Sequence, residues 1–241
     1  SRNPRWASGC GYNDYRNNVI YNWEYASSYG GEAHQKGDRR KPPIEHSTIN
    51  MIANYYKPGP ATDSKVRSCI TAPSSRNGDA DAGKWWVSDN FVEGSPTVTA
   101  DNLLGVTKTS SAYRLNEPWP AMEINQQTAE EAFQSVLDHA GCSLPKRDKV
   151  DSDIVDDVLH GTAKYGNKGI IDSPSDVGGW PTLNSTTAPV DSDHDGMPDN
   201  WEKVNGLNPE DSKDGKEIGK DGYTNLENYL NSLVKSSDPS L

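Results

Sequence analysis

The sequence predicts an all-β solenoid with the features of a parallel β-helix, followed by a helical extension and a compact acidic loop. Three observations support this fold class. Short β-prone segments recur within residues 12–100, two later segments carry apolar residues at helical spacing, and an acidic run lies near the end of the chain. We therefore expect β-helix coils over residues 1–120, a helical and extended tail over 121–190, and a loop–helix module over 191–241.

The recurring segments each end in asparagine. The last asparagines of the three segments are 32 and 36 residues apart; the segments are Asn18-Val-Ile-Tyr-Asn22, Asn50-Met-Ile-Ala-Asn54 and Trp86-Val-Ser-Asp-Asn90. In stacked parallel coils, asparagines at equivalent turns hydrogen-bond to one another, which gives the residue a physical reason to recur. A β-sandwich with asparagine-rich turns is the alternative that this pattern leaves open.

Two helices are expected after the coils. Thr128 and Glu131 form a capping box, and Asp151 can cap a second helix. Glycine ends each helix, at Gly141 and Gly161. The apolar stripes are Phe133, Val136, Leu137 and Ala140 in the first helix, and Ile154, Val155, Val158 and Leu159 in the second. Residues 161–190, rich in Gly, Pro, Ser and Thr, are expected to be extended.

The acidic run has the spacing of a twelve-residue calcium loop. Acidic residues occupy positions 1, 3, 5, 9 and 12, glycine occupies the sharp turn at position 6, and position 7 offers a backbone carbonyl. The predicted ligands are Asp191, Asp193, Asp195, Met197, Asp199 and Glu202. The partner loop is degenerate at Glu217, Gly219 and Asn228, so a second ion is not expected there. A short helix over 200–205 and an amphipathic helix over 226–234 indicate an EF-hand-like structural staple for Ca²⁺.

Composition excludes several classes. The 241 residues carry a net charge of -11, with +4 in residues 1–70 and -15 in residues 71–241. No basic helix or zinc motif indicates nucleic-acid binding, and no apolar run approaches the ~18 residues of a membrane span. The chain has no signal peptide or initiator methionine, which suggests a mature product or a fragment. Cys10, Cys69 and Cys142 are expected to be buried thiols. The basic stretch from Lys36 to Lys41 is expected to be a solvated loop.

Several motifs carry a resemblance to a known family. They are Ser1-Arg-Asn-Pro-Arg5, Tyr15-Arg-Asn-Asn-Val-Ile-Tyr-Asn22, Tyr29-Gly-Gly-Glu32, Asn54-Tyr-Tyr-Lys-Pro-Gly-Pro-Ala-Thr62, Pro145-Lys-Arg-Asp148 and Gly169-Ile-Ile-Asp-Ser-Pro-Ser-Asp-Val-Gly-Gly-Trp180, together with the acidic loop and Tyr223-Thr-Asn-Leu-Glu227. The chain resembles the C-terminal half of pectate lyases of polysaccharide lyase family 1, in particular those of Bacteroidetes. The resemblance covers nearly the whole chain.

The resemblance implies a secreted, monomeric right-handed parallel β-helix, here present only as its C-terminal coils, that cleaves α-1,4-polygalacturonate by calcium-assisted β-elimination. The family's catalytic base is the arginine of an Arg-x-Pro motif, which falls on Arg2. Because free guanidinium does not act as a base near neutral pH, calcium and neighbouring cations would have to lower the pKa of Arg2. A second family arginine falls on Ala7, so its substrate-binding role is either unfilled or passed to Arg5 or Arg16.

The family's catalytic calcium ligands and its substrate-binding lysine precede the Arg-x-Pro motif, and this sequence does not contain them. The resemblance therefore implies a chain that is incomplete for catalysis. Two alternatives stay open: a non-catalytic, calcium-stapled β-helix that binds carbohydrate or the cell surface, and a calcium-dependent interaction module.

Overall fold

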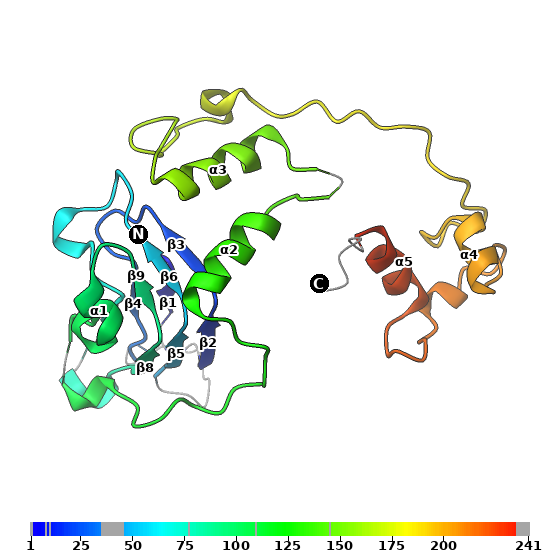
Figure 1. Cartoon of the computed structure of the whole chain (residues 1–241). Coiled ribbons are helices and arrows are strands. Elements are labelled where there is room, and N and C mark those ends of the chain that lie inside the picture. Colours follow the sequence, from blue (N-terminus) through cyan, green and yellow to red (C-terminus); the bar gives the residue numbers. More distant parts are fainter. Residues whose placement is uncertain are drawn as a thin grey trace. The chain divides into compact units, whose positions relative to one another are not determined.

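The first hundred residues form three coils, and each coil contributes one short strand to each of three parallel sheets (Figure 1). The computed structural model describes residues 2–7, 9, 11–34, 46–76, 78–108, 110–144 and 146–234. The predicted basic loop, Lys36 to Lys41, and Cys10 lie outside these residues. The sheets are β1 (Arg5–Trp6), β4 (Ser28–Gly30) and β7 (Thr71–Pro73); β2 (Tyr12–Arg16), β5 (Thr48–Ile52) and β8 (Lys84–Ser88); and β3 (Val19–Tyr21), β6 (Tyr55–Lys57) and β9 (Phe91–Val92).

Every strand pairing in these sheets is parallel and joins successive coils, which is the arrangement of a parallel β-helix rather than of a β-sandwich. Inward-pointing side chains of the three sheets fill one apolar interior. Ile49, Met51, Tyr56 and Ile70 are fully buried there, and Trp85 is nearly so. The parallel-coil part of the predicted fold class is therefore confirmed.

The asparagine ladder exists, with one correction. Asn18, not Asn22, is its first member: the backbone and side-chain amides of Asn18 donate to Asn54 Oδ1 at 3.1 and 3.0 Å, and those of Asn54 donate to Asn90 Oδ1 at 3.0 and 2.9 Å. Both steps span 36 residues. Asn22 was the wrong choice because the strand register pairs Asp14 with Asn50, which places the equivalent turn four residues earlier.

The ladder ends at a helical cap. Asn90 donates to Asn102 Oδ1, and Asn102 Nδ2 donates to the carbonyl of Val98 at 2.8 Å. Val98 lies in α1 (Pro96–Ala100) and Asn102 begins η3 (Asn102–Gly105). Buried Val98 and Val106 cover the interior at this end of the coils. Other short 3-10 segments include η1 (Ser64–Val66), η2 (Gly78–Asp81), η4 (Ser111–Tyr113) and η5 (Pro174–Val177).

Helix α2 (Ala129–His139) packs on the third sheet. Its predicted capping box between Thr128 and Glu131 is present. The Tyr55 ring on β6 stacks against both Phe91 and Phe133, with centroids 4.8 and 4.2 Å apart. The chain before α2 crosses the second sheet, where Asn50 exchanges hydrogen bonds with the backbone of Trp119. The apolar stripe of α2 thus fixes the helical extension to the coils.

Helix α3 (Lys149–His160) begins earlier than predicted. Its N-cap is Asp148, whose carboxylate accepts from Asp151 N at 2.9 Å. Asp151 instead accepts from Cys142 N, which belongs to the preceding turn. Gly161 ends α3 in the left-handed conformation, as predicted. Cys142 is exposed and Cys69 is only half-buried, so the prediction of buried thiols is wrong for both.

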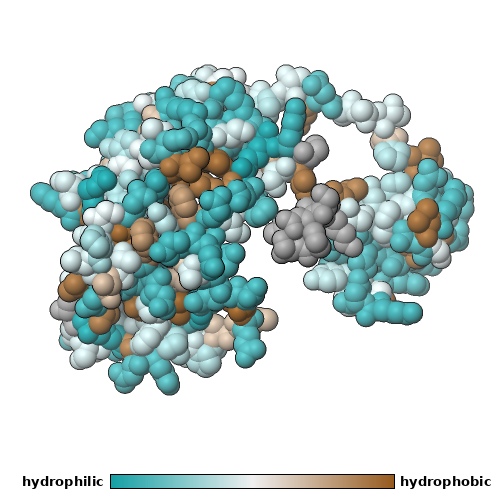
Figure 2. Space-filling model, in the orientation of Figure 1, coloured by the Kyte–Doolittle hydropathy of each residue, from teal (hydrophilic) through white to brown (hydrophobic). Residues whose placement is uncertain are grey.

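Residues 181–241, with residues 144–146, cluster as a second compact unit. This unit holds α4 (Asp199–Asn205), η6 (Asp214–Lys216) and α5 (Asn225–Leu233), and Gly206 ends α4 in the left-handed conformation. Figure 2 shows a mostly hydrophilic surface with small, scattered apolar patches. Among the described residues, no helix has the length and apolar character needed to cross a lipid bilayer.

Candidate functional sites

Arg2 lies beside the first sheet, immediately before β1. Its side chain is exposed, and Nε donates a hydrogen bond to the hydroxyl of Tyr29 on β4, 3.3 Å away. This hydrogen bond, with the charge interactions of Tyr29 and Tyr25, raises the pKa of Arg2. The lowered pKa expected from the sequence depends on calcium and neighbouring cations, so it stays a prediction. A further positive charge that lowers the pKa would have to be brought to Arg2 by a ligand or by another polypeptide segment.

Arg5 belongs to a second cationic group on the same sheet. Its Nη2 lies 2.5 Å from Glu32 Oε1, and Arg76 Nη2 lies 3.2 Å from the same oxygen. The Arg5 guanidinium also lies over the Tyr29 ring, 5.2 Å from its centroid. Arg2 and Arg5 thus meet the same tyrosine, one at its hydroxyl and the other at its face.

Glu32 is the anion that holds the two guanidinium groups. It is buried, and burial acts to raise its pKa, but hydrogen bonds from Ser74, its own backbone, Arg76 and Arg5 lower the pKa to about 2. Glu32 follows β4, whereas Arg5 and Arg76 come from the preceding and following coils. Sequence analysis missed Glu32 and Arg76 as site residues, although the Tyr29–Glu32 motif had drawn attention to that turn.

Arg16 does not join this group. It lies on β2 in the second sheet, where its Nε bonds Asp14 Oδ2 at 2.7 Å and its Nη1 bonds Gln126 Oε1 at 2.6 Å. Arg16 also lines a hollow of about 440 Å³ with Trp119 and Met122. Of the three predicted arginines, the structure therefore brings Arg2 and Arg5 together at Tyr29 and leaves Arg16 apart.

The acidic loop forms a cluster within the second unit. Ligand atoms of Asp191, Asp193 and Asp195 lie within 4.8 Å of one another, and so do those of Asp195, Glu202 and Asp214. Glu202 is fully buried. Burial, followed by the charges of Asp193, Asp195, Asp214 and Asp199, raises the pKa of Glu202 to about 7. An arrangement of oxygen ligands this dense suits a hard cation.

One predicted ligand, Asp199, is placed differently. Asp199 uses both oxygens on Ser192, accepting from its backbone amide at 2.8 Å and its hydroxyl at 2.9 Å, and lies outside both acidic groups. Met197, whose carbonyl is the expected ligand, has a fully buried side chain. Asp214 was missed because it lies beyond the twelve-residue loop.

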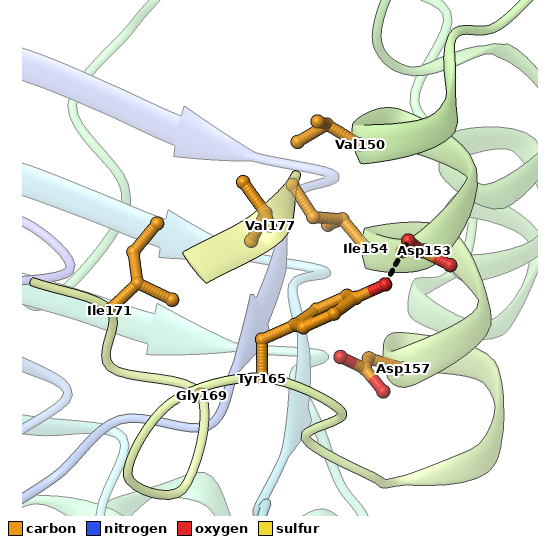
Figure 3. Close-up of a pocket in the computed structure, with 8 residues that line it drawn as sticks. All are labelled: Val150, Asp153, Ile154, Asp157, Tyr165, Gly169, Ile171 and Val177. Carbon is orange, nitrogen blue, oxygen red and sulfur yellow. Dashed lines mark hydrogen bonds between the residues drawn. The ribbon is translucent and has the colours of Figure 1, made fainter. Parts of the chain in front are cut away.

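A further pocket of about 160 Å³ lies between α3 and the segment that follows it (Figure 3). Val150, Ile154 and Ile171 are among its apolar lining residues. Its two carboxylates are already bonded: Asp153 pairs with Lys149 and Lys164, and Asp157 accepts from Thr162 at 2.6 Å. The paired carboxylates leave this pocket without a group suited to catalysis, so we assign it no function.

Comparison with known proteins indicates which proteins the chain is similar to. No family model matches the chain. The chain is 33% identical to a probable pectate lyase C of Neosartorya fischeri over 98% of its length and 51% of the relative's. Proteins of the same name from Aspergillus fumigatus and Aspergillus terreus are 34% and 32% identical, again over 98% of this chain. The chain spans about half the length of these curated relatives.

This similarity confirms the resemblance to pectate lyases. The relatives found are fungal, and they do not support the narrower likeness to enzymes of Bacteroidetes.

Proposed function

We propose that this chain is the part of a secreted family 1 pectate lyase that carries the catalytic arginine. The observation that carries the proposal is the grouping of Arg2, Arg5 and Arg76 on one parallel sheet around Tyr29 and Glu32, in a chain similar to pectate lyases over 98% of its length. Cationic side chains in successive coils suit a polyanionic substrate that lies along the sheet. That substrate is α-1,4-polygalacturonate.

The reaction is a β-elimination that begins with loss of the C5 proton of a galacturonate unit. The proton lies α to a carboxylate, so the transition state adds charge to a group that is already anionic, and fixed cations stabilise it. Arg2 is the proposed base. Tyr29 raises its pKa, so the guanidinium is protonated in this chain alone and needs further positive charge nearby before it can accept a proton. Arg5 and Arg76 bind substrate carboxylates, with Arg76 in the role expected of Arg16.

The acidic loop is a separate, structural site for Ca²⁺. Asp191, Asp193, Asp195 and Glu202, with the carbonyl of Met197, would hold the ion in an EF-hand-like loop. The second unit contains none of the arginines that carry the proposed chemistry. Calcium here would neutralise repelling carboxylates and hold the loop in shape, and it would supply no step of the elimination.

The chain alone is incomplete for catalysis. The outer edges of β1, β2 and β3 pair with no strand among the described residues, which leaves room for further coils beside Arg2. We expect the 241-residue chain, incubated with polygalacturonate and Ca²⁺, to release no unsaturated product by ultraviolet absorbance. Robust turnover by the chain would contradict this part of the proposal.

A chimera tests the catalytic assignment. This chain replaces the matching half of a curated relative, and product release is followed with and without Arg2→Lys. We expect activity that falls by at least about a thousandfold on Arg2→Lys, the order expected on loss of a general base. An unchanged rate would refute the role of Arg2.

Substrate binding is tested by affinity electrophoresis of the 241-residue chain in gels containing polygalacturonate. We expect Arg5→Gln and Arg76→Gln each to reduce retardation. Arg67→Gln is the matched control, because Arg67 is an exposed arginine of the same coils outside the cluster. Binding of polygalacturonate by the chain, with no elimination by the chimera, would favour the alternative of a non-catalytic carbohydrate-binding β-helix.

A further inference from the structure

Two aspartates of the acidic loop, Asp193 and Asp195, divide their oxygens between the backbone and the interior of the cluster. Asp193 Oδ1 accepts from Asp195 N at 3.2 Å, and Asp195 Oδ1 accepts from Met197 N at 2.8 Å. The second oxygen of each aspartate is buried and has no hydrogen-bond partner among the described residues. One oxygen therefore shapes the loop while the other is left for a ligand.

Asp214 shows the same division, although it lies outside the loop in η6. Its Oδ2 accepts from Asn208 N at 2.9 Å, and its Oδ1 is buried without a partner in the described part of the chain. Asp214 is 8% exposed. Its carboxylate lies within 4.8 Å of ligand atoms of both Asp195 and Glu202.

Glu202 provides an independent sign of a cation site. It is 0% exposed, and neither of its carboxylate oxygens has a hydrogen-bond partner among the residues described. A fully buried, unpartnered carboxylate is costly unless a cation meets it. Among the described residues, the ion pair of this unit joins Lys203 and Asp199 at 3.7 Å and does not involve Glu202.

The backbone beside Asp214 is fitted closely to the loop. A Cβ atom built on Gly215 would lie 2.4 Å from Asp195 Oδ2, so any side chain at this position would collide with one of the inward oxygens. The turn therefore approaches the loop at the position where the unpartnered carboxylates converge.

We propose that Asp214 is a direct ligand of the cation held by the acidic loop, so that one ion links residues 191–202 to the η6 turn. The inference rests on the calcium site proposed above. The ion would also stabilise the fold of this unit. Met197 is the one fully buried large apolar residue of the unit among those described. With so small an apolar core, the ion is a main source of the free energy that folds the unit.

Calorimetric titration of the calcium-depleted 241-residue chain with CaCl₂ tests this assignment. We expect one ion per chain, with Asp214→Asn weakening the affinity at least tenfold and Glu210→Gln changing it less than twofold. Glu210 is a matched control because it lies in the same segment, is exposed, and loses the same charge. Absence of calcium binding by the unmodified chain would refute the loop site itself. Equal affinities for the two variants, or two ions per chain, would refute only the shared site.

Hydrogen exchange of the unmodified chain provides a second test that does not depend on a variant's folding. Added calcium should slow exchange of the amides in 191–202 and in 208–216 at the same calcium midpoint. Protection of residues 191–202 with no change in 208–216 would overturn the role of Asp214, even though the loop itself binds calcium.

Discussion

The asparagine ladder allows a quantitative prediction at Asn54. This fully buried side chain makes four hydrogen bonds: Oδ1 accepts two from Asn18, and Nδ2 donates to Tyr15 O at 3.0 Å and to Asn90 Oδ1 at 2.9 Å. Each bond contributes about 1 kcal/mol net. In Asn54→Ala, water can replace part of the hydrogen bonding lost by half-buried Asn18. Water cannot reach buried Asn90 on the other side of Asn54. We expect the free energy of unfolding of the coils to fall by about 3 kcal/mol.

The matched substitution is Asn18→Ala, at the other end of the same interaction. Asn18 is half-buried, and among the described residues its side chain donates to Asn54 Oδ1 and to Arg16 O, so we expect a loss of about 1 kcal/mol. Thermal unfolding, followed by near-ultraviolet circular dichroism, should show Tm lowered by roughly 6–12 °C for Asn54→Ala and by roughly 2–4 °C for Asn18→Ala. Equal losses for the two variants would refute the view that the buried ladder is a main contributor to coil stability.

Two further predictions concern the sites. Glu32 has a pKa lowered to about 2, so it contributes stability that is fully present above its unfolded pKa of about 4.5 and is lost as pH falls from there towards 2. The free energy of unfolding, measured as pH is lowered, should fall by up to about 3 kcal/mol, and this fall should be absent in Glu32→Gln. The same fall in the variant would show that Glu32 is not its source. Gly215→Ala removes no carboxylate but places a methyl group against Asp195 Oδ2. The calcium affinity measured by calorimetry should therefore fall at least tenfold. An affinity within twofold of that of the unmodified chain would show that the η6 turn can move away from the loop.

Local signals in the sequence predicted the elements whose determinants are local. The capping box at Thr128 and the glycine at 161 are found where the sequence placed them, because each acts within one helical turn. The cap of α3 was misplaced from Asp148 to Asp151 because either aspartate can cap, and the choice depends on Cys142 in the preceding turn.

The misassigned and missed residues depend on contacts between coils or segments. Asn22 fits the repeating pattern as well as Asn18 does, and only the strand register separates them. In the cationic group, Arg5 and Arg76 bond Glu32 across 27 and 44 positions of the sequence. No local sequence motif predicts contacts between residues that far apart. Asp214 has no place in a twelve-residue pattern. It reaches the loop through a turn whose path is visible only in three dimensions.

The ladder also has a direction. Each asparagine donates to the next coil towards the helical cap, so the side-chain dipoles align along the axis, and the Oδ1 of Asn18 accepts no hydrogen bond from the described residues. Any layer that docks on the first coil would gain a bond by presenting an amide donor at that point. The open edge of the first coil therefore favours an amide donor in any coil that packs on it. An asparagine in the same register would supply that donor.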